Sequence, residues 1–209
     1  LDEEKYVKAQ DKFKFVLSRG TGTDYGDDAQ FFLAESYFLN DQFMLSIKEY
    51  ENLTRKMAFS PFFEKSRFRI CEAYRIESPD YYNDQSYTEK ALERYQEFLD
   101  DFPESEHGQN VTESMSILRN KLAKKLYETG VLYLKIDEFE PARMSFNSVL
   151  DQYYDTDIVE QVYVGMIKSY IKSNKIKQAK EYWLNKGQEE IVSEELINEI
   201  EHLFAEVEK

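Results

Sequence analysis

The feature that most constrains this chain is a set of four side-chain positions that recurs along it. The set first appears as Ala34, Tyr37, Ser46 and Tyr50, which are 3, 9 and 4 residues apart. It recurs as Cys71, Tyr74, Ala91 and Tyr95, as Gly130, Tyr133, Ala142 and Phe146, and as Ile167, Tyr170, Ala179 and Trp183. Such internal similarity predicts an array of repeats, each packed on its neighbours.

Two repeats depart from the regular spacing. Between Tyr74 and Ala91 the gap is 17 residues, because an eight-residue insertion, Ser78 to Gln85, lies in the turn between two predicted helices. At the start of the chain only Ala9 and Phe13 match the last two positions, so we expect that the first repeat has either lost its leading helix or has it outside this sequence. An ordinary helical bundle with coincident aromatic residues is the alternative to a repeat array.

The spacing of apolar residues indicates helices. The sequence has only 7 Gly and 4 Pro, and its apolar side chains recur every three or four residues without alternating. The recurring positions resemble the tetratricopeptide repeat, in which small residues let two helices approach and aromatic residues fill the space beside them. The resemblance implies an all-α tetratricopeptide-repeat superhelix of about five helix pairs, the first pair incomplete, plus a C-terminal amphipathic helix.

The pattern also gives approximate boundaries. We predict helices over 3–18, 27–39, 42–57, 61–76, 87–101, 107–120, 122–135, 138–152, 157–172, 175–186 and 193–208. They group into N-terminal repeats over 1–106 with a candidate groove for client peptides, C-terminal repeats over 107–186 as a candidate docking half, and an acidic amphipathic helix over 187–209. That last helix is expected either to cap the array or to bind a partner.

Charge and hydropathy exclude several classes of protein. The 209 residues carry a formal net charge of -14, and residues 187–209 hold eight Glu against one Lys. Nucleic-acid binding requires clustered Lys and Arg, so nucleic acid is not an expected partner. The longest apolar stretch, Val162 to Ile167, is far shorter than the roughly 20 residues that cross a bilayer. The single cysteine, Cys71, forbids an internal disulfide.

The sequence offers no pattern typical of catalysis. Its two histidines, His107 and His202, are far apart, and neither belongs to a metal-binding spacing. Gly20-Thr21-Gly22 lacks the preceding strand and the lysine of a phosphate-binding loop. Cys71 occupies a small-residue position, which packing explains without reactivity. We therefore expect no enzymatic activity, no cofactor and no metal.

A binding surface is expected on the first helix of each pair, which lines the concave face in this class of repeat. Counting from the tyrosine positions gives six groove candidates: Phe31, Glu35, Phe38, Phe68, Glu72 and Arg75. Aromatic side chains beside charged ones suit an extended peptide, because rings supply contact area and charges set the register. The alternative for Phe31 and Phe68 is packing in the core or between repeats.

Three segments carry a closer resemblance. They are Ser78 to Phe98, with its insertion followed by Thr88, Lys90, Ala91 and Gln96, then Phe102-Pro103-Glu104-Ser105-Glu106, and then the run Leu118-Arg119-Asn120-Lys121-Leu122-Ala123. Together they resemble the BamD family of outer-membrane assembly lipoproteins, particularly its Bacteroidetes-like versions, over nearly the whole chain. Tyr154 departs from the family pattern, which has proline after the fourth repeat.

The resemblance implies a non-enzymatic scaffold of the β-barrel assembly machine at the periplasmic face of the outer membrane. Its implied partners are the POTRA domain of BamA nearest the barrel, other lipoproteins of the machine and unfolded outer-membrane proteins. Membrane contact would be only through a lipid on an N-terminal cysteine, which this sequence does not contain. The later repeats would dock on BamA, with four candidate residues, Arg119, Asn120, Tyr127 and Lys168. A generic peptide-binding adaptor or co-chaperone is the alternative.

Overall fold

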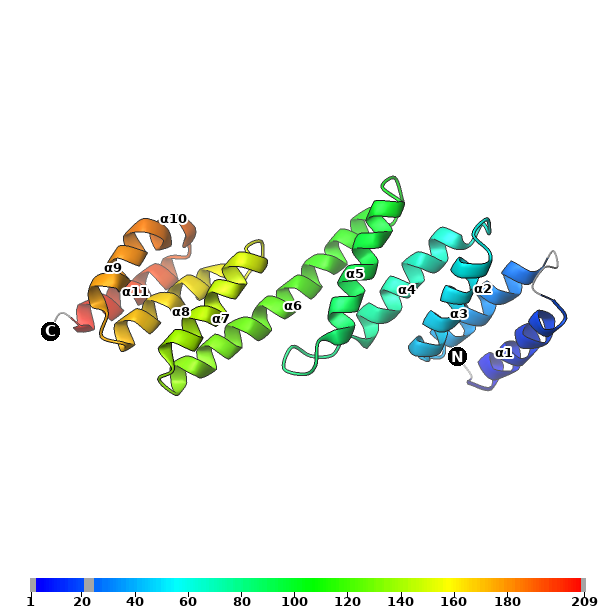
Figure 1. The fold of residues 1–209 in the computed structure, drawn as a ribbon, viewed down its shortest axis with the longest axis horizontal. Helices are drawn as coiled ribbons and strands as arrows, with labels where there is room; N and C mark the ends of the chain where they lie inside the picture. The colour runs from blue at the N-terminus through cyan, green and yellow to red at the C-terminus, as the bar shows by residue number, and fades with distance from the viewer. Residues whose placement is uncertain (1–2, 21–24, 208–209) are drawn as a thin grey trace. The chain divides into compact units, whose positions relative to one another are not determined.

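The computed structural model describes residues 3–20 and 25–207, where the regular elements are helical (Figure 1). Residues 21–24 of the predicted glycine-containing connection lie outside this part. The elements are α1 (Glu3–Ser18), α2 (Gly26–Phe38), α3 (Phe43–Lys56), α4 (Phe63–Glu77), α5 (Ser86–Asp101), α6 (Gly108–Lys135), α7 (Phe139–Gln152), α8 (Val159–Lys172), α9 (Ile176–Tyr182), the π-helical turn η1 (Trp183–Gly187), α10 (Gln188–Glu190) and α11 (Glu194–Val207). Consecutive helices pack on one another, which confirms the all-α fold of tetratricopeptide type.

Two predicted helix boundaries are wrong. The helices predicted over 107–120 and 122–135 form one continuous helix, α6, because no Gly or Pro separates them and the apolar pattern continues through Leu118 and Leu122. The helix predicted over 175–186 changes to a π-helical turn at Trp183. There the indole packs directly on Gly187, where a Cβ atom would lie 2.5 Å from the Trp183 ring. Within the described ranges, no helix is long and apolar enough to cross a bilayer.

The chain divides into two compact units, Leu1–Leu118 and Arg119–Lys209, hereafter unit 1 and unit 2. The expected divisions after residues 106 and 186 do not coincide with this boundary. Val111 and Leu118 of α6 are buried in the core of unit 1, whereas Ala123 of the same helix is buried in unit 2. The acidic helix α11 belongs to unit 2, where Ile200 is buried in a cluster with Ile167 of α8.

The recurring positions form the cores. In unit 1, Ala34, Tyr50, Ala91 and Tyr95 are all 0% exposed. In unit 2, the Phe146 ring fills the space between two glycines on different helices. A Cβ atom would lie 2.5 Å from the ring at Gly130 of α6 and 2.7 Å from it at Gly165 of α8. The ring therefore occupies the volume that side chains at these two positions would need.

The turns within the regular pairs share one backbone geometry. Asp41, Asp137 and Asn174 each lie four residues after a repeat tyrosine and have left-handed φ values of 55°, 60° and 58°. The following residue donates its N–H to that tyrosine's carbonyl, as at Gln42 to Tyr37. This is the Schellman termination, here with Asp or Asn in the position that glycine commonly occupies. In the repeat with the insertion, Ser78 is extended instead, with φ −65° and ψ 114°.

The contact between Phe146 and the glycines generates a stability prediction. Gly130→Ala should destabilise the chain by about 1–3 kcal/mol relative to Gly108→Ala, because the added methyl group overpacks the core. Gly108 is the matched control, since a Cβ atom added there would meet no atom within 4 Å. Urea unfolding of the full chain would measure the difference. Equal stability of the two variants would contradict the packing account.

A second prediction concerns the thiol of Cys71, which is 1% exposed. Burial raises its pKa to about 12, so the folded protein holds the unreactive neutral thiol at pH values near 8. A thiol reagent should therefore label the native chain far more slowly than the unfolded chain. Labelling rates measured across a urea series would test this. Rapid labelling without urea, with the helical circular dichroism signal intact, would contradict it.

Candidate functional site

Phe31 and Phe68, two of the groove candidates, are covered by rings from the start of the next helix pair. The Phe62 ring stacks on Phe31 at 4.4 Å between centroids and 11° between planes. The His107 ring stacks on Phe68 in the same way, at 4.1 Å and 5°. Phe31 is only 1% exposed and belongs to the core of unit 1, so packing and not groove lining is its role. Phe68 is partly buried against the same core.

Glu35 and Phe38 lie together at the junction of α2 and α4, where Arg69 joins them. The Arg69 guanidinium lies 4.7 Å from the centre of the Phe38 ring, and its Nε atom donates to Glu35 at 2.8 Å. The buried Tyr50 hydroxyl also donates to Glu35. Sequence reasoning missed Arg69, because nothing in its spacing showed that it would reach across to the preceding repeat.

Glu72 likewise bonds to a buried tyrosine and an arginine one repeat later, but its arginine, Arg75, lies on the same helix. Arg75 donates to both oxygens of Glu72, at 3.0 and 2.7 Å, and the Tyr95 hydroxyl donates to the same carboxylate. Burial by itself would raise the pKa of Glu72, but the hydrogen bonds from Arg75 and Tyr95 and the neighbouring Arg75 and Arg69 charges outweigh it and lower the pKa.

Two exposed apolar side chains flank these groups. Leu39 is 53% and Ile76 42% exposed, and each follows its repeat tyrosine by two residues. We call the surface formed by Glu35, Phe38, Leu39, Arg69, Glu72, Arg75 and Ile76 the α2–α4 strip. It combines apolar area with paired charges, a combination that suits contact with an extended peptide.

Arg119 and Asn120, two of the docking candidates, both hold the turn between α7 and α8. Arg119 forms a bidentate pair with Asp155, at 3.1 and 2.6 Å, and donates to the Gln152 carbonyl at 2.9 Å. The Asn120 side-chain oxygen accepts from the Asp157 N–H at 2.9 Å. The turn fixed by these bonds carries Tyr154, which is 73% exposed.

Tyr127 and Lys168, the other docking candidates, lie near α11. The Tyr127 ring packs 5.8 Å from that of Phe146 and is partly buried. Lys168 of α8 forms an ion pair with Glu199 of α11 at 2.6 Å. Burial raises the pKa of Tyr127, and the Glu128 and Glu199 charges add to this effect. Tyr127 therefore packs in the core of unit 2, and Lys168 joins α8 to α11.

A further regularity between repeats was missed by the sequence analysis. Three acidic residues each lie ten positions before the tyrosine of a repeat. Each bonds to a serine that lies ten positions after the last recurring aromatic residue of the same repeat, which is Tyr50, Tyr95 or Trp183. The pairs are Asp27 with Ser60 at 2.9 Å, Glu64 with Ser105 at 2.6 Å, and Glu160 with the N–H of Ser193 at 3.0 Å. In the remaining repeat Ala123 replaces the acid, and the Arg119 bonds secure the turn instead. These pairs could have been predicted from the sequence, because the spacing of ten residues is the same in each of the three repeats.

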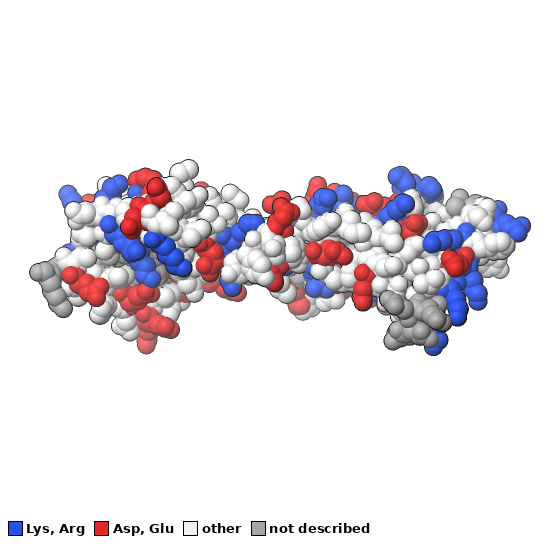
Figure 2. All heavy atoms as spheres, turned by 90° about the horizontal axis from the view of Figure 1, so that it is seen from below, with Lys and Arg blue, Asp and Glu red and all other residues white. Residues whose placement is uncertain are grey.

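The charged surface is mixed. On the face drawn in Figure 2, the described Lys and Arg side chains are interspersed with Asp and Glu. Nor do the described residues place three or more His, Cys, Asp or Glu side chains where they could hold a metal ion. Candidate binding residues come together in two places, the α2–α4 strip in unit 1 and the exposed turn around Tyr154 in unit 2.

The lowered pKa of Glu72 generates a prediction. A carboxyl whose pKa is lower in the folded than in the unfolded chain stabilises the fold above its ordinary pKa of 4.5, and this stabilisation is lost as pH falls through the lowered value. Glu72→Gln should therefore reduce the free energy of unfolding at pH 7. As the pH falls, the free energy of unfolding should decrease less in this variant than in the unchanged chain.

The matched control is Glu104→Gln, which makes the same charge change at an exposed position. Urea unfolding between about pH 3 and pH 7 would measure both variants against the intact chain. The interpretation would be wrong if Glu72→Gln and Glu104→Gln had parallel stability curves.

Comparison with known proteins gives two findings. A family model described as YfiO, outer membrane lipoprotein, matches residues 1–184. Outer membrane protein assembly factor BamD of Rickettsia prowazekii (strain Madrid E) is 24% identical over 189 residues, which cover 87% of this chain and 72% of that protein. Both helices of the α2–α4 strip and the turn around Tyr154 lie within the matched residues, whereas α11 lies beyond residue 184.

Proposed function

Because the chain belongs to the YfiO family of outer membrane lipoproteins, we propose that it is a non-enzymatic scaffold in the assembly of outer-membrane proteins. The name of its relative, an outer membrane protein assembly factor, supports this role. The chain would act at the periplasmic face of the outer membrane, held there by a lipid anchor. The observation that carries the proposal is the family match over both candidate binding surfaces.

We propose that the α2–α4 strip receives extended segments of unfolded outer-membrane proteins. Phe38 and the exposed Leu39 and Ile76 would supply apolar contact. Arg69, now paired with Glu35 at 2.8 Å, could exchange part of that pairing for a carboxylate or carbonyl of the client. A partly apolar strip of exchangeable ion pairs favours segments with alternating apolar and polar side chains, as in the strands of a β-barrel.

For unit 2 we propose docking on the periplasmic domain of BamA through the turn around Tyr154. Arg119 and Asn120 would act as positioning residues, since their side chains bond to the turn itself. Tyr154, at 73% exposure, would make the contact, because an exposed tyrosine presents a large rigid ring with a polar end. One chain would then hold a client and BamA together, which raises the effective concentration of each for the other.

A test of the client surface uses a peptide of the last strand of an outer-membrane β-barrel from the same organism. Phe38→Ala should weaken its binding about tenfold by calorimetry, because the ring supplies buried contact area. The matched control is Phe59→Ala, since Phe59 is a fully exposed aromatic in the same unit, outside the strip. Equal affinity in the two variants, with both chains folded, would assign Phe38 to packing alone.

A test of the docking surface uses the periplasmic domains of BamA. Tyr154→Ala should weaken binding about tenfold without changing the melting temperature, because the exposed ring contributes little to the fold. Met144→Ala, another exposed substitution in unit 2, is the control. Unchanged BamA affinity in Tyr154→Ala would remove this turn from the interface. Client binding without any BamA binding would favour a generic peptide-binding adaptor.

A further inference from the structure

A second polar surface lies on the side of α4 that faces away from the α2–α4 strip. Arg67 and Arg69 are two residues apart on α4, and therefore about 200° apart around the helix axis. Arg69 belongs to the strip, whereas Arg67 lines a cleft of about 260 Å³ between three helices. The lining residues are Glu51, Thr54 and Arg55 of α3, Arg67 and Ile70 of α4, and Arg94 of α5.

The cleft concentrates guanidinium groups in an acidic protein. The chain has eight arginines, and three of them line this one cleft, each from a different helix. Arginines bring together rigid, permanently charged donors, which are well suited to binding an oxyanion. Electrostatic repulsion among three positively charged guanidinium groups would disfavour this arrangement unless nearby anions offset the repulsion.

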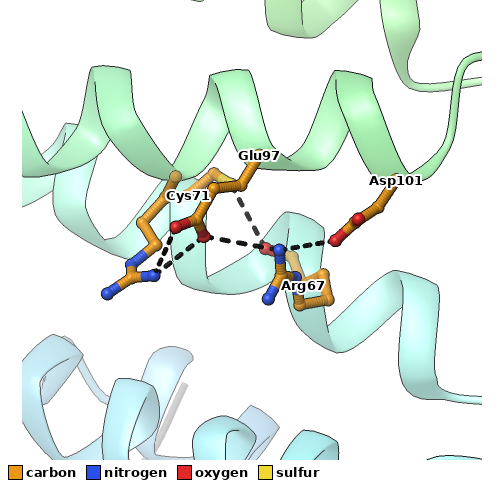
Figure 3. A network of polar contacts seen from close by, with 5 residues as sticks. Arg67, Cys71, Glu97 and Asp101 are labelled. Carbon is orange, nitrogen blue, oxygen red and sulfur yellow. Dashed lines mark hydrogen bonds and ion pairs between the residues drawn. The ribbon is translucent and has the colours of Figure 1, made fainter.

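Carboxylates of α5 hold two of these guanidinium groups in place. Figure 3 shows Arg67 facing Glu97 and Asp101, to which its Nη2 atom donates at 3.4 and 2.8 Å. Arg94 donates to both oxygens of Glu97 from its Nη1 atom, at 3.0 and 2.8 Å. Because both side chains are fixed by Glu97, they are preorganised for a ligand and would lose little conformational entropy on binding one.

The bonds within the protein use only part of the donor capacity. Among the described residues, Arg67 and Arg94 each bond through one terminal nitrogen, and Arg55 bonds through Nη2 to Asn52 at 2.7 Å. A guanidinium group has five N–H donors. The Nε atom of Arg94 is buried and has no acceptor within the described part of the chain. An unpaired buried donor is costly, and a small shift of the group toward an anion would satisfy it.

We infer that this cleft binds a phosphate group, either free or in the head group of a phospholipid. A planar carboxylate is satisfied by a single guanidinium fork, whereas a tetrahedral phosphate presents oxygens in several directions and can use donors from three helices. The volume of about 260 Å³ leaves room for the atoms that a head group carries beside its phosphate. Glu51 lines the cleft, and its charge, together with those of Glu97 and Asp101 beside the arginines, would limit the affinity.

The first test is calorimetric titration of the full chain with inorganic phosphate at low salt. Arg55→Gln should weaken binding at least about tenfold, since it removes a charged donor. Arg55 is exposed, and its side chain bonds to Asn52 within the same helix, so the fold should tolerate this change. Arg19→Gln makes the same charge change just after α1, where the guanidinium lies over Phe15, and should leave the affinity unaltered. Glu51→Gln should strengthen binding severalfold.

The second test distinguishes the two sources of phosphate. Vesicles of phosphatidylglycerol in phosphatidylcholine would be sedimented with the intact chain and with both arginine variants. Vesicle binding that Arg55→Gln loses and Arg19→Gln keeps would support the site and assign it to a lipid head group. Binding of inorganic phosphate, with the same variant pattern but without vesicle binding, would support the site and assign it to free phosphate.

Three results would overturn the inference. One is the failure of the folded chain to bind either phosphate or vesicles. Another is an equal loss of affinity in Arg55→Gln and Arg19→Gln, which would show a general effect of net charge. The third is binding of acetate as tight as that of phosphate, which would show that the cleft does not select a tetrahedral anion.

Discussion

Close approach of helices around buried aromatic rings is the constraint on which the rest of this structure depends. The Phe146 ring can lie between α6 and α8 only because Gly130 and Gly165 have no side chains. In unit 1, Tyr50 and Tyr95 are fully buried beside small residues, and their hydroxyls must find acceptors. Those acceptors lie at the edge of the core, so the packing of each repeat also fixes where its polar surface begins.

This arrangement gives the acids of the α2–α4 strip two tasks. Glu35 and Glu72 accept from buried tyrosine hydroxyls and also pair with arginines at the surface. The tyrosine bonds hold the carboxylates in one orientation, which in turn positions Arg69 and Arg75. A ligand that competes for these arginines would leave the tyrosine bonds in place. Each of these carboxylates thus serves a buried tyrosine and a surface arginine at the same time.

The sequence predicted most of what depends on contacts within one repeat, with the π-helical turn at Trp183 as an exception. The helix pairs follow from apolar spacing, and positions such as Ala34 and Tyr95 proved to be core. Contacts between repeats were harder to predict. Phe31 lies on the expected face of α2, but Phe62 covers it from the next repeat. Arg119 was a docking candidate only through its place in the run shared with the family, and the sequence did not show that it bonds to Asp155 within its own unit. A single sequence does not show which distant partner a long side chain will reach.

The continuous helix α6 affects how such a chain can change over evolutionary time. A repeat array lengthens or shortens most simply by duplicating or losing a whole helix pair at the turns that separate pairs. Within α6 the boundary between the units, after Leu118, has no turn, because Gly108–Lys135 is one helix. We therefore expect helix pairs to be gained or lost at the turns before and after α6. A recombination event after Leu118 would have to keep the residues on both sides in the same helical register.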